Sequence, residues 1–296
     1  MKFVITGSTG NISKTLSEKL IDAGHDVSVI TSSKEKIKDI EALGATALVG
    51  SVEDESFLTS AFVGADAVYT MIPPKTDSIN WQAFIHHVGN TYVKAIIASG
   101  VKRVVNLSSI GAHLASGGGL TSLYHYCEQE LNKLEGVAVT HLRPGSFYYN
   151  FFGNIGMIKH MGIIGNNYAD QVLPLTHPRD IAAAAFQELV TYSTGINIRY
   201  VVSDELSTSE IAKILGGAIG KPDLQWIKFE DEDALNGMIQ AGLSPDVSKN
   251  LVEMGQAVQR GDSVSDYKLH KPVLGESKFE DFANNEFAPA YNNAQL

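Results

Sequence analysis

A glycine turn near the N-terminus has the residue types and spacing of a phosphate-binding site. Gly7 and Gly10 lie between an apolar run, residues 3–5, and a segment, residues 14–22, whose apolar residues recur at helical spacing. A turn that follows a strand and opens a helix presents backbone N–H groups and the positive helix end to an anion. This spacing predicts binding of a dinucleotide pyrophosphate. The residues predicted to bind it are Gly7, Ser8, Thr9, Gly10, Asn11 and Ile12.

The turn departs from the usual dinucleotide fingerprint at one position. Ser13 stands where that fingerprint has its third glycine. Two glycines at this spacing also arise by chance, so a purely structural turn between strand and helix is the alternative. The position of the turn, directly after a strand and before a helix, favours cofactor binding.

The end of the second expected strand, residues 27–30, indicates which dinucleotide binds. Thr31, Ser32, Ser33 and Lys34 follow it, and no carboxylate occurs before residue 35. Sites that prefer NAD place an acid here to take the ribose hydroxyls, whereas hydroxyls and a lysine suit a 2′-phosphate. We therefore predict NADP as the preferred cofactor and NAD as the second choice. Capping of the next helix by the two serines is compatible with this role.

The remaining site candidates come from other strand ends, because ligands of such sheets bind at the carboxyl ends of the strands. The further cofactor-binding candidates are Met71, Ile72, Pro73, Ser108 and Pro144. Phe147, Tyr149 and Asn150 are the substrate candidates, since aromatic rings stack on a flat acceptor and an amide can hydrogen-bond to it. Packing of a small lobe onto the sheet is the alternative role of this aromatic run.

Strands and helices alternate along the first half of the chain. Strands are expected at residues 3–5, 27–30, 46–49, 67–72, 103–107 and 137–142, and helices at 14–22, 34–43, 54–62, 81–99 and 124–134. Such alternation predicts an α/β fold with a Rossmann-type, doubly wound parallel sheet. Residues 1–150 are expected to form this NAD(P)-binding domain, with return segments near 172–204. Residues 151–296 are expected to form mainly a small C-terminal α+β lobe on the substrate side, and residues 111–119 a mobile cover.

Composition narrows the range of functions. The net charge of −10 disfavours a broad nucleic-acid surface, and no apolar run reaches the length of a membrane span. The single cysteine, Cys127, cannot form an internal disulfide, which suggests a cytoplasmic protein. Adjacent His86 and His87 point in different directions on a helix, so no metal site is expected. A homodimer is compatible with the sequence, and a small-molecule acceptor is the expected partner.

Four motifs together resemble the NmrA-like group, which comprises atypical members of the short-chain dehydrogenase superfamily. The motifs are Gly7-Ser-Thr-Gly-Asn-Ile12, Leu107-Ser-Ser-Ile-Gly111, Leu142-Arg-Pro-Gly-Ser-Phe147 with Asn150, and His177-Pro-Arg-Asp-Ile181. The resemblance covers essentially the whole chain. It implies an NAD(P)-binding fold in a group that includes NADPH:quinone reductases, other reductases and non-catalytic redox-sensing regulators.

The chain departs from the superfamily at the proton-transfer residues. Standard members use Tyr-x-x-x-Lys, in which the lysine lowers the tyrosine pKa. Here Tyr124 is followed four residues later by Glu128, and Tyr126 by Glu130. A carboxylate raises the pKa of a nearby tyrosine, so this sequence argues against a tyrosine–lysine relay and against most sugar epimerase chemistry.

Hydride transfer to a quinone or a small conjugated carbonyl remains the predicted reaction. The cofactor supplies the hydride, and the protein holds the acceptor against it while water or a neighbouring side chain supplies protons. His125 and Tyr126 lie in the helix from which such a side chain would come, and they are the catalytic candidates. The alternative is a non-catalytic NAD(P)-binding regulator that reports redox state to a protein partner.

Overall fold

A seven-stranded parallel sheet forms the larger half of the protein. The computed structural model describes residues 1–294 of the chain. Its strand order is β10-β6-β5-β4-β1-β2-β3. The strands are β1 (Lys2–Ile5), β2 (Asp26–Thr31), β3 (Thr46–Val49), β4 (Ala67–Thr70), β5 (Arg103–Leu107), β6 (Ala138–Pro144) and β10 (Ile196–Val201). The chain proceeds outward from β1 in both directions, so the strand order reverses between β1 and β4. Ligands of open α/β sheets bind at this reversal.

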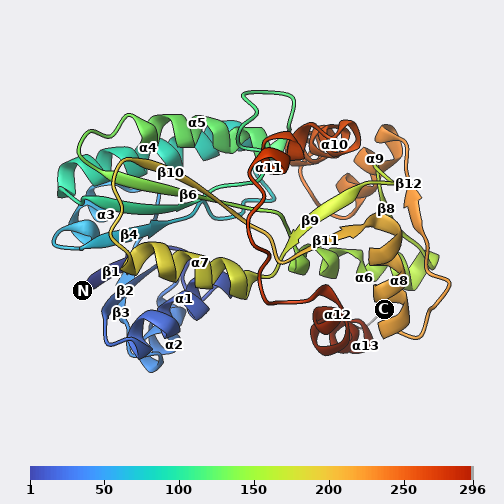
Figure 1. Cartoon of the computed structure of the whole chain (residues 1–296), viewed down its shortest axis with the longest axis horizontal. Helices are drawn as coiled ribbons and strands as arrows, with labels where there is room; N and C mark the ends of the chain where they lie inside the picture. The colour runs from blue at the N-terminus through green and yellow to red at the C-terminus, as the bar shows by residue number, and fades with distance from the viewer. Residues whose placement is uncertain (295–296) are drawn as a thin grey trace.

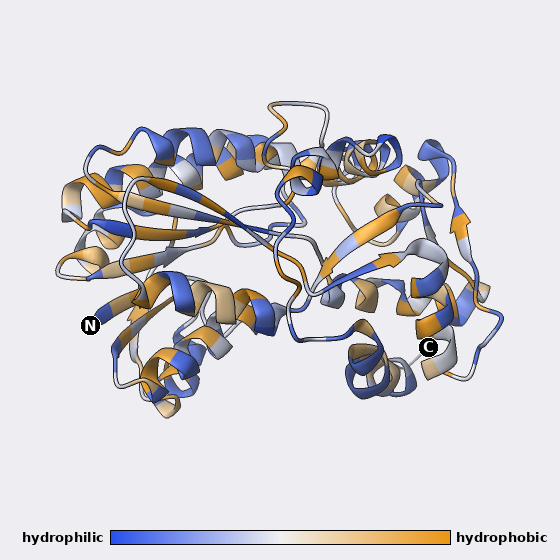
Figure 2. Ribbon diagram, viewed as in Figure 1, coloured by the Kyte–Doolittle hydropathy of each residue, from blue (hydrophilic) through white to orange (hydrophobic). Residues whose placement is uncertain are grey.

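Helices cover both faces of the sheet (Figure 1). One face carries α1 (Asn11–Asp22), α2 (Ile37–Ala42) and α7 (Pro178–Val190), and the other carries α3 (Glu55–Phe62), α4 (Trp81–Ser99) and α5 (Leu120–Asn132). Each face has its own hydrophobic core, because side chains of a buried parallel strand alternate between the two faces. Figure 2 shows the hydrophobic residues running along the strands. The predicted Rossmann-type architecture is confirmed.

A smaller lobe follows β6. It contains a three-stranded sheet, β11-β9-β7, and a two-stranded sheet, β12-β8. Its strands are β7 (Ser146–Phe147), β8 (Ile164–Asn166), β9 (Val172–Thr176), β11 (Asp204–Ser207) and β12 (Trp226–Lys228). Its helices are η2 (Tyr148–Asn154), α6 (Ile155–Met161), α8 (Thr208–Ala218), α9 (Asp231–Gln240), α12 (Phe279–Phe282), the π-helix η4 (Ala283–Phe287) and α13 (Ala288–Asn293). An aromatic-rich core holds these elements together.

The chain crosses between the two halves more than once. After β9 it returns to the large sheet through α7 and β10, and β10 pairs in parallel with β6. Helix α10 (Pro245–Arg260) lies beside α5, and its Val247 belongs to the core of the large domain. Helices η3 (Asp262–Val264) and α11 (Ser265–Leu269) follow it, and residues 270–278 lead back to the lobe. The second half of the chain therefore contributes to both bodies.

Several element boundaries differ from those expected. The fourth strand ends at Thr70 rather than residue 72, since two prolines follow closely and cannot extend a ladder. Helix α5 begins at Leu120, four residues before its expected start at Tyr124. The segment predicted to be a mobile cover, residues 111–119, ends in contact with α10. The approach is so close that a Cβ on Gly119 would overlap the backbone of Asn250 and Met254.

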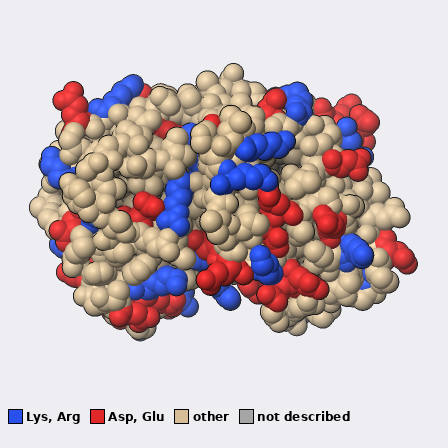
Figure 3. Space-filling model, viewed as in Figure 1, with Lys and Arg blue, Asp and Glu red and all other residues tan. Residues whose placement is uncertain are grey.

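Charges of both signs are interspersed over the face shown in Figure 3. None of the helices within residues 1–294 is long and apolar enough to span a membrane. The same residues contain no cluster of three or more His, Cys, Asp or Glu side chains that could hold a metal ion.

Candidate functional site

The glycine turn leaves the start of α1 open toward the carboxyl edge of the sheet. Gly7 has a φ of 96° and Ser8 a φ of 55°, so the backbone passes through the left-handed region that favours glycine. Gly10 is the N-cap of α1, and no side chain caps the helix there. The first N–H groups of a 12-residue helix therefore face outward without a side-chain acceptor. This geometry fits a phosphate group.

Ser13 is accommodated in place of the third glycine by a buried hydrogen bond. Its hydroxyl donates to the carbonyl oxygen of Thr6 at 2.7 Å. That hydroxyl lies so close to the turn that a Cβ on Gly7 would overlap it, and Met71 borders the same position. Gly7 is thus required both by its φ and by the contact with Ser13.

The ends of β1 and β4 are joined directly beside the turn. The backbone N–H of Met71 donates to the Thr6 hydroxyl at 2.9 Å, and the Tyr92 hydroxyl donates to the Met71 carbonyl at 2.7 Å. Met71 therefore lies at the predicted cofactor edge. The side chain of Ile72 points instead into the core beneath α3 and α4, so this predicted site residue can offer only its backbone. Pro73 follows outside the strand.

The end of β2 carries the groups predicted to select the cofactor. The Ser8 hydroxyl donates to the Thr31 hydroxyl at 2.9 Å, which ties the glycine turn to β2. Ser33 caps the short helix η1 (Lys34–Lys36), since its hydroxyl accepts from the N–H of residue 35. Ser32 and Lys34 stay exposed, and within residues 1–294 Lys34 has no carboxylate partner within 4.0 Å. These two side chains suit a 2′-phosphate.

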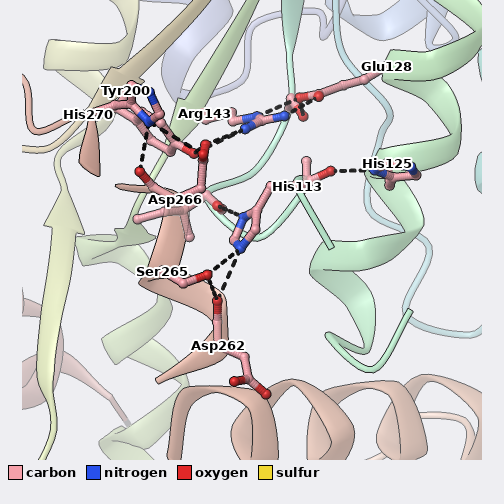
Figure 4. Close-up of polar contacts among 12 residues, drawn as sticks. His113, His125, Glu128, Arg143, Tyr200, Asp262, Ser265, Asp266 and His270 are labelled. Atoms are coloured by element: carbon pink, nitrogen blue, oxygen red, sulfur yellow. Dashed lines mark hydrogen bonds and ion pairs between the residues drawn. The ribbon is translucent and has the colours of Figure 1, made fainter. Parts of the chain in front are cut away.

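A buried ion pair lies behind the ends of β5 and β6 (Figure 4). The Arg143 guanidinium donates to both carboxylate oxygens of Glu128, at 3.0 and 2.6 Å. The Glu128 carboxylate also accepts from the Ser108 hydroxyl at 2.5 Å. Burial alone would lower the pKa of Arg143, but the Glu128 carboxylate outweighs it and raises that pKa above its ordinary value. The hydroxyl of the predicted cofactor residue Ser108 is therefore already bonded to Glu128. The adjacent Ser109 is half-buried, whereas Ser108 is buried.

The same guanidinium reaches across to α11. Arg143 donates to the Tyr200 hydroxyl at 3.0 Å and to the Asp266 carboxylate at 3.1 Å, and Tyr200 also donates to Asp266. One side chain thus fastens α5, β6, β10 and α11 together. This network is not predicted from the sequence. Its only local signal is an arginine inside a strand, directly before Pro144, which ends β6 at the cofactor edge.

The two catalytic candidates on α5 have separate surroundings. Tyr126 points toward α4, where its hydroxyl donates to Asn90 at 3.0 Å and its ring stacks on His86 at 3.8 Å between centroids. His125 lies 2.9 Å, through Nδ1, from the carbonyl oxygen of Ala112, which fixes the ring and leaves Nε2 without a partner among the described residues. Of the two candidates, His125 keeps a polar atom, Nε2, without a partner among the described residues, whereas the Tyr126 hydroxyl is bonded to Asn90.

The acidity of Tyr124, one of the two tyrosines of α5 that are followed by a glutamate four residues later, is suppressed. Burial, followed by the neighbouring Cys127, raises the pKa of Tyr124 to about 12. Glu128, the cause expected from the sequence, has its charge neutralised by Arg143. A neutral phenol at every ordinary pH is consistent with the absence of a tyrosine–lysine relay.

The three substrate candidates divide between the cleft side and the lobe. Phe147 packs, as Met71 does, against the core beneath α1 and α7, so it lies at the predicted cofactor edge. Tyr149 belongs to the aromatic core of the lobe, and its hydroxyl donates to Glu286 at 2.7 Å. Asn150 is exposed, with its amide 3.4 Å from the Ser146 hydroxyl. For Tyr149 the packing alternative describes the structure better than ligand binding does.

Comparison with known proteins gives consistent results. The sequence is 24% identical to the (4-alkanoyl-5-oxo-2,5-dihydrofuran-3-yl)methyl phosphate reductase of Streptomyces griseus, with 88% of this chain and 89% of that protein covered. It is also 24% identical to the NAD(P)H azoreductase of Xenophilus azovorans, over 85% of each chain.

Two solved structures share the fold over almost their whole length. An NADPH-dependent quinone oxidoreductase of Escherichia coli, complexed with NADPH, has a TM-score of 0.75 at 20% identity and 98% coverage of both chains. The triphenylmethane reductase of Citrobacter sp. has a TM-score of 0.81 at 18% identity, covering 98% of this chain and 100% of that one. The sequence model of the NmrA-like family matches residues 1–268, and the chain therefore belongs to the NmrA-like family.

Proposed function

We propose that this protein is an NAD(P)H-dependent oxidoreductase that passes a hydride to a quinone or a small conjugated carbonyl compound. The open N-terminus of α1 at the Gly7–Gly10 turn carries the proposal, because it offers unpaired N–H groups to a pyrophosphate. The relatives named as reductases, and the NADPH bound to one structural neighbour, support it. NADP is the preferred cofactor and NAD the second choice.

In this mechanism the chain binds and orients, and the cofactor, when bound, supplies the hydride. The glycine turn holds the pyrophosphate, and Ser32 and Lys34 hold the 2′-phosphate. Phe147 offers a flat surface at the same edge for an acceptor ring. The Nδ1–H of His125 donates to the Ala112 carbonyl, so Nε2 of the neutral ring can take a proton from water and then pass it to the reduced acceptor; water can also protonate the acceptor directly. No tyrosine–lysine relay takes part.

The test is oxidation of NADPH, followed by absorbance, with a panel of quinones and conjugated carbonyl compounds. Turnover with at least one member supports the proposal. Absence of turnover across the panel, together with tight but unequal binding of oxidised and reduced cofactor, would establish the redox-sensing regulator instead. Failure of both cofactors to protect the protein in a thermal-shift titration would exclude both functions.

Lys34→Glu tests the choice of cofactor. The exposed lysine attracts the 2′-phosphate, and a carboxylate in its place repels it, so we expect KM for NADPH to rise at least about tenfold. KM for NADH should change less than about twofold, because NADH lacks that phosphate. Lys38→Glu, an exposed lysine further along the same segment, is the matched control. Equal losses with both cofactors would refute the assignment.

Two further properties belong to the proposal. We place the enzyme in the cytoplasm, since its one cysteine, Cys127, is a buried free thiol that cannot form an internal disulfide. We also propose that it forms a homodimer, because its large sheet ends in an edge strand with exposed isoleucines.

A further inference from the structure

The outer edge of β10 is open. This strand pairs only with β6, and it stands at one end of the seven-stranded sheet (Figure 1). The first half of the strand is exposed, with 43% of Ile196 and 51% of Ile198 accessible. Within residues 1–294, no backbone group of another element bonds to residues 196–200 from the outer side. The strand thus presents unpaired N–H and C=O groups framed by apolar side chains.

The edge lacks the features that normally prevent strands from pairing. Sheets are usually protected by an outward lysine, a proline or a bulge on the edge strand. The only charged residue in β10, Arg199, folds back onto α7, where it donates to Glu188 at 2.9 Å and to Gln187 at 2.6 Å. The edge strand at the opposite end of the sheet, β3, is protected by its shortness, since it has only four residues. The edge of β10 has no such protection and is available for pairing.

Exposed apolar side chains gather around this edge. Tyr192, just before the strand, is 81% exposed, and Val273 is 97% exposed. Ile198, Val273 and Leu274 line one cavity of about 790 Å³, bounded by β10, α7 and residues 272–276. Such a concentration of apolar surface marks an interaction site rather than ordinary exposure.

The chain segment beside the cavity is held in place at both ends. Asp266, just before it, is bound by Arg143 and Tyr200. At its other end, the N–H of Gly275 donates to the carbonyl of Val202 at 2.8 Å, and Ser277 donates its hydroxyl to Asp180 at 3.0 Å. Its apolar residues are therefore presented in a fixed geometry.

The charges at the cavity match a copy of the same surface. Lys19, at the end of α1, and Glu276, on the opposite segment, both line the cavity. Within residues 1–294 neither side chain has an ion-pair partner within 4.0 Å. Across a twofold axis, Lys19 of one copy can face Glu276 of the other, and the same contact then forms a second time with the copies exchanged. Both charges of each copy are thereby paired.

We propose that a second copy of this chain docks on this surface, with the two β10 strands pairing antiparallel across a twofold axis. Two identical strands related by such an axis run antiparallel, and the two sheets become continuous. Lys19 of each copy pairs with Glu276 of the other. The exposed half of β10 is its N-terminal half, whereas cofactors of parallel sheets bind at the carboxyl ends, so both cofactor edges stay open. The proposal locates the homodimer interface and is independent of the reaction catalysed.

The test measures molar mass by sedimentation velocity or light scattering across a concentration series. The wild type should have twice the chain mass of 31.9 kDa. Ile198→Lys places a charge on the pairing edge and should raise the dissociation constant at least about 100-fold. Ile97→Lys is the matched control, because Ile97 is 66% exposed on α4, away from β10, and its dimer should persist. A monomeric wild type at tens of micromolar, or a dimer lost only in Ile97→Lys, would overturn the proposal.

A charge-swap experiment covers the case in which Ile198→Lys fails to fold. Lys19→Glu should weaken the dimer, and Lys19→Glu combined with Glu276→Lys should restore it. Loss without restoration would contradict the pairing. NADPH oxidation is assayed in parallel, and it should be unchanged per chain in the monomeric variant, which separates failure of the interface from failure of the proposed reaction.

Discussion

Glu128 shows how one buried side chain sets the role of a helix. It lies four residues after Tyr124, the spacing at which a Tyr-x-x-x-Lys motif would have its lysine. A carboxylate there would be costly if it were alone, since it is only 2% exposed as a side chain. Arg143 neutralises it with two hydrogen bonds. Glu128 is thus part of the framework that holds the strand ends at the cofactor edge.

Glu128→Ala should destabilise the protein strongly. It leaves the Arg143 guanidinium buried without its main partner, which costs about 3–5 kcal/mol in the free energy of unfolding. Urea unfolding followed by circular dichroism measures the loss. Glu130→Ala is the control, because its partner Lys133 is 68% exposed and such surface pairs contribute at most about 1 kcal/mol. Similar losses in the two variants would contradict this account of the network.

Tyr126→Phe should leave turnover within about twofold of the wild type. The hydroxyl that it removes is bonded to Asn90 on α4, and the stacking of the ring on His86 survives in phenylalanine. Steady-state kinetics with NADPH and an active quinone provide the measurement. A fall in kcat of a hundredfold with unchanged cofactor affinity would show that the tyrosine takes part in proton transfer.

Helix α11 shows how a short element is held by electrostatics. Its Asp266 accepts from Tyr200 and Arg143, which belong to β10 and β6. Burial alone would raise the pKa of Asp266, but these contacts and the nearby His270 lower it below the ordinary value of 3.8. A carboxyl group with a lowered pKa stabilises the folded protein fully above its unfolded pKa, and that contribution disappears as the pH falls through the folded pKa.

Asp266→Asn should therefore destabilise the protein in a pH-dependent way. We expect a loss of about 1–3 kcal/mol at pH 7, the range for hydrogen bonds to charged groups. The difference from the wild type should stay constant down to about pH 5 and shrink below pH 3.8. Urea unfolding at a series of pH values provides the test. A difference that grew toward low pH would mean that the carboxylate is not stabilised as described.

Local pattern predicted most of the elements but few of the contacts between them. The glycine turn and the alternating strands can be predicted from residues close together in the chain, and the Ser207–Glu210 capping box of α8 is a contact of the same local kind. The Arg143–Asp266 contact joins residues 123 positions apart, and the Tyr149–Glu286 contact joins residues 137 positions apart. A single sequence carries no signal for such pairings, so the contact of Tyr149 with Glu286 could not be predicted from it.

At the scale of the whole molecule, the C-terminal segment joins the two bodies and completes the lobe. Phe279, Phe282 and Phe287 are buried in the lobe core, around Tyr148. Glu286, in the π-helix η4, accepts from Tyr149 and His177. His177 accepts from the Arg179 N–H through Nδ1, so its proton lies on Nε2 and points to Glu286. The last helices are therefore part of the core of the lobe and not an appendage.

Phe282→Ala should destabilise the lobe by about 3–5 kcal/mol, because it removes a side chain that is 2% exposed and leaves a cavity among aromatic rings. Thermal unfolding and hydrogen exchange of the lobe peptides provide the measurement. Leu274→Ala, at a residue 38% exposed, is the control and should cost less than about 1 kcal/mol. Comparable effects would mean that the segment is not an integral part of the core.

The phenylalanines of this segment follow the other lobe elements in the chain, and this order has a consequence for biosynthesis. A ribosome makes the strands of the large sheet first, and the lobe elements between β6 and α8 emerge before residues 279–287 exist. Until residues 279–287 have been made, the apolar side chains of Tyr148, Phe151 and Leu215 have no cover from these phenylalanines. A nascent chain stalled before residue 279 should therefore expose an apolar, aggregation-prone surface, which chaperones would need to shield until the covering helices have emerged.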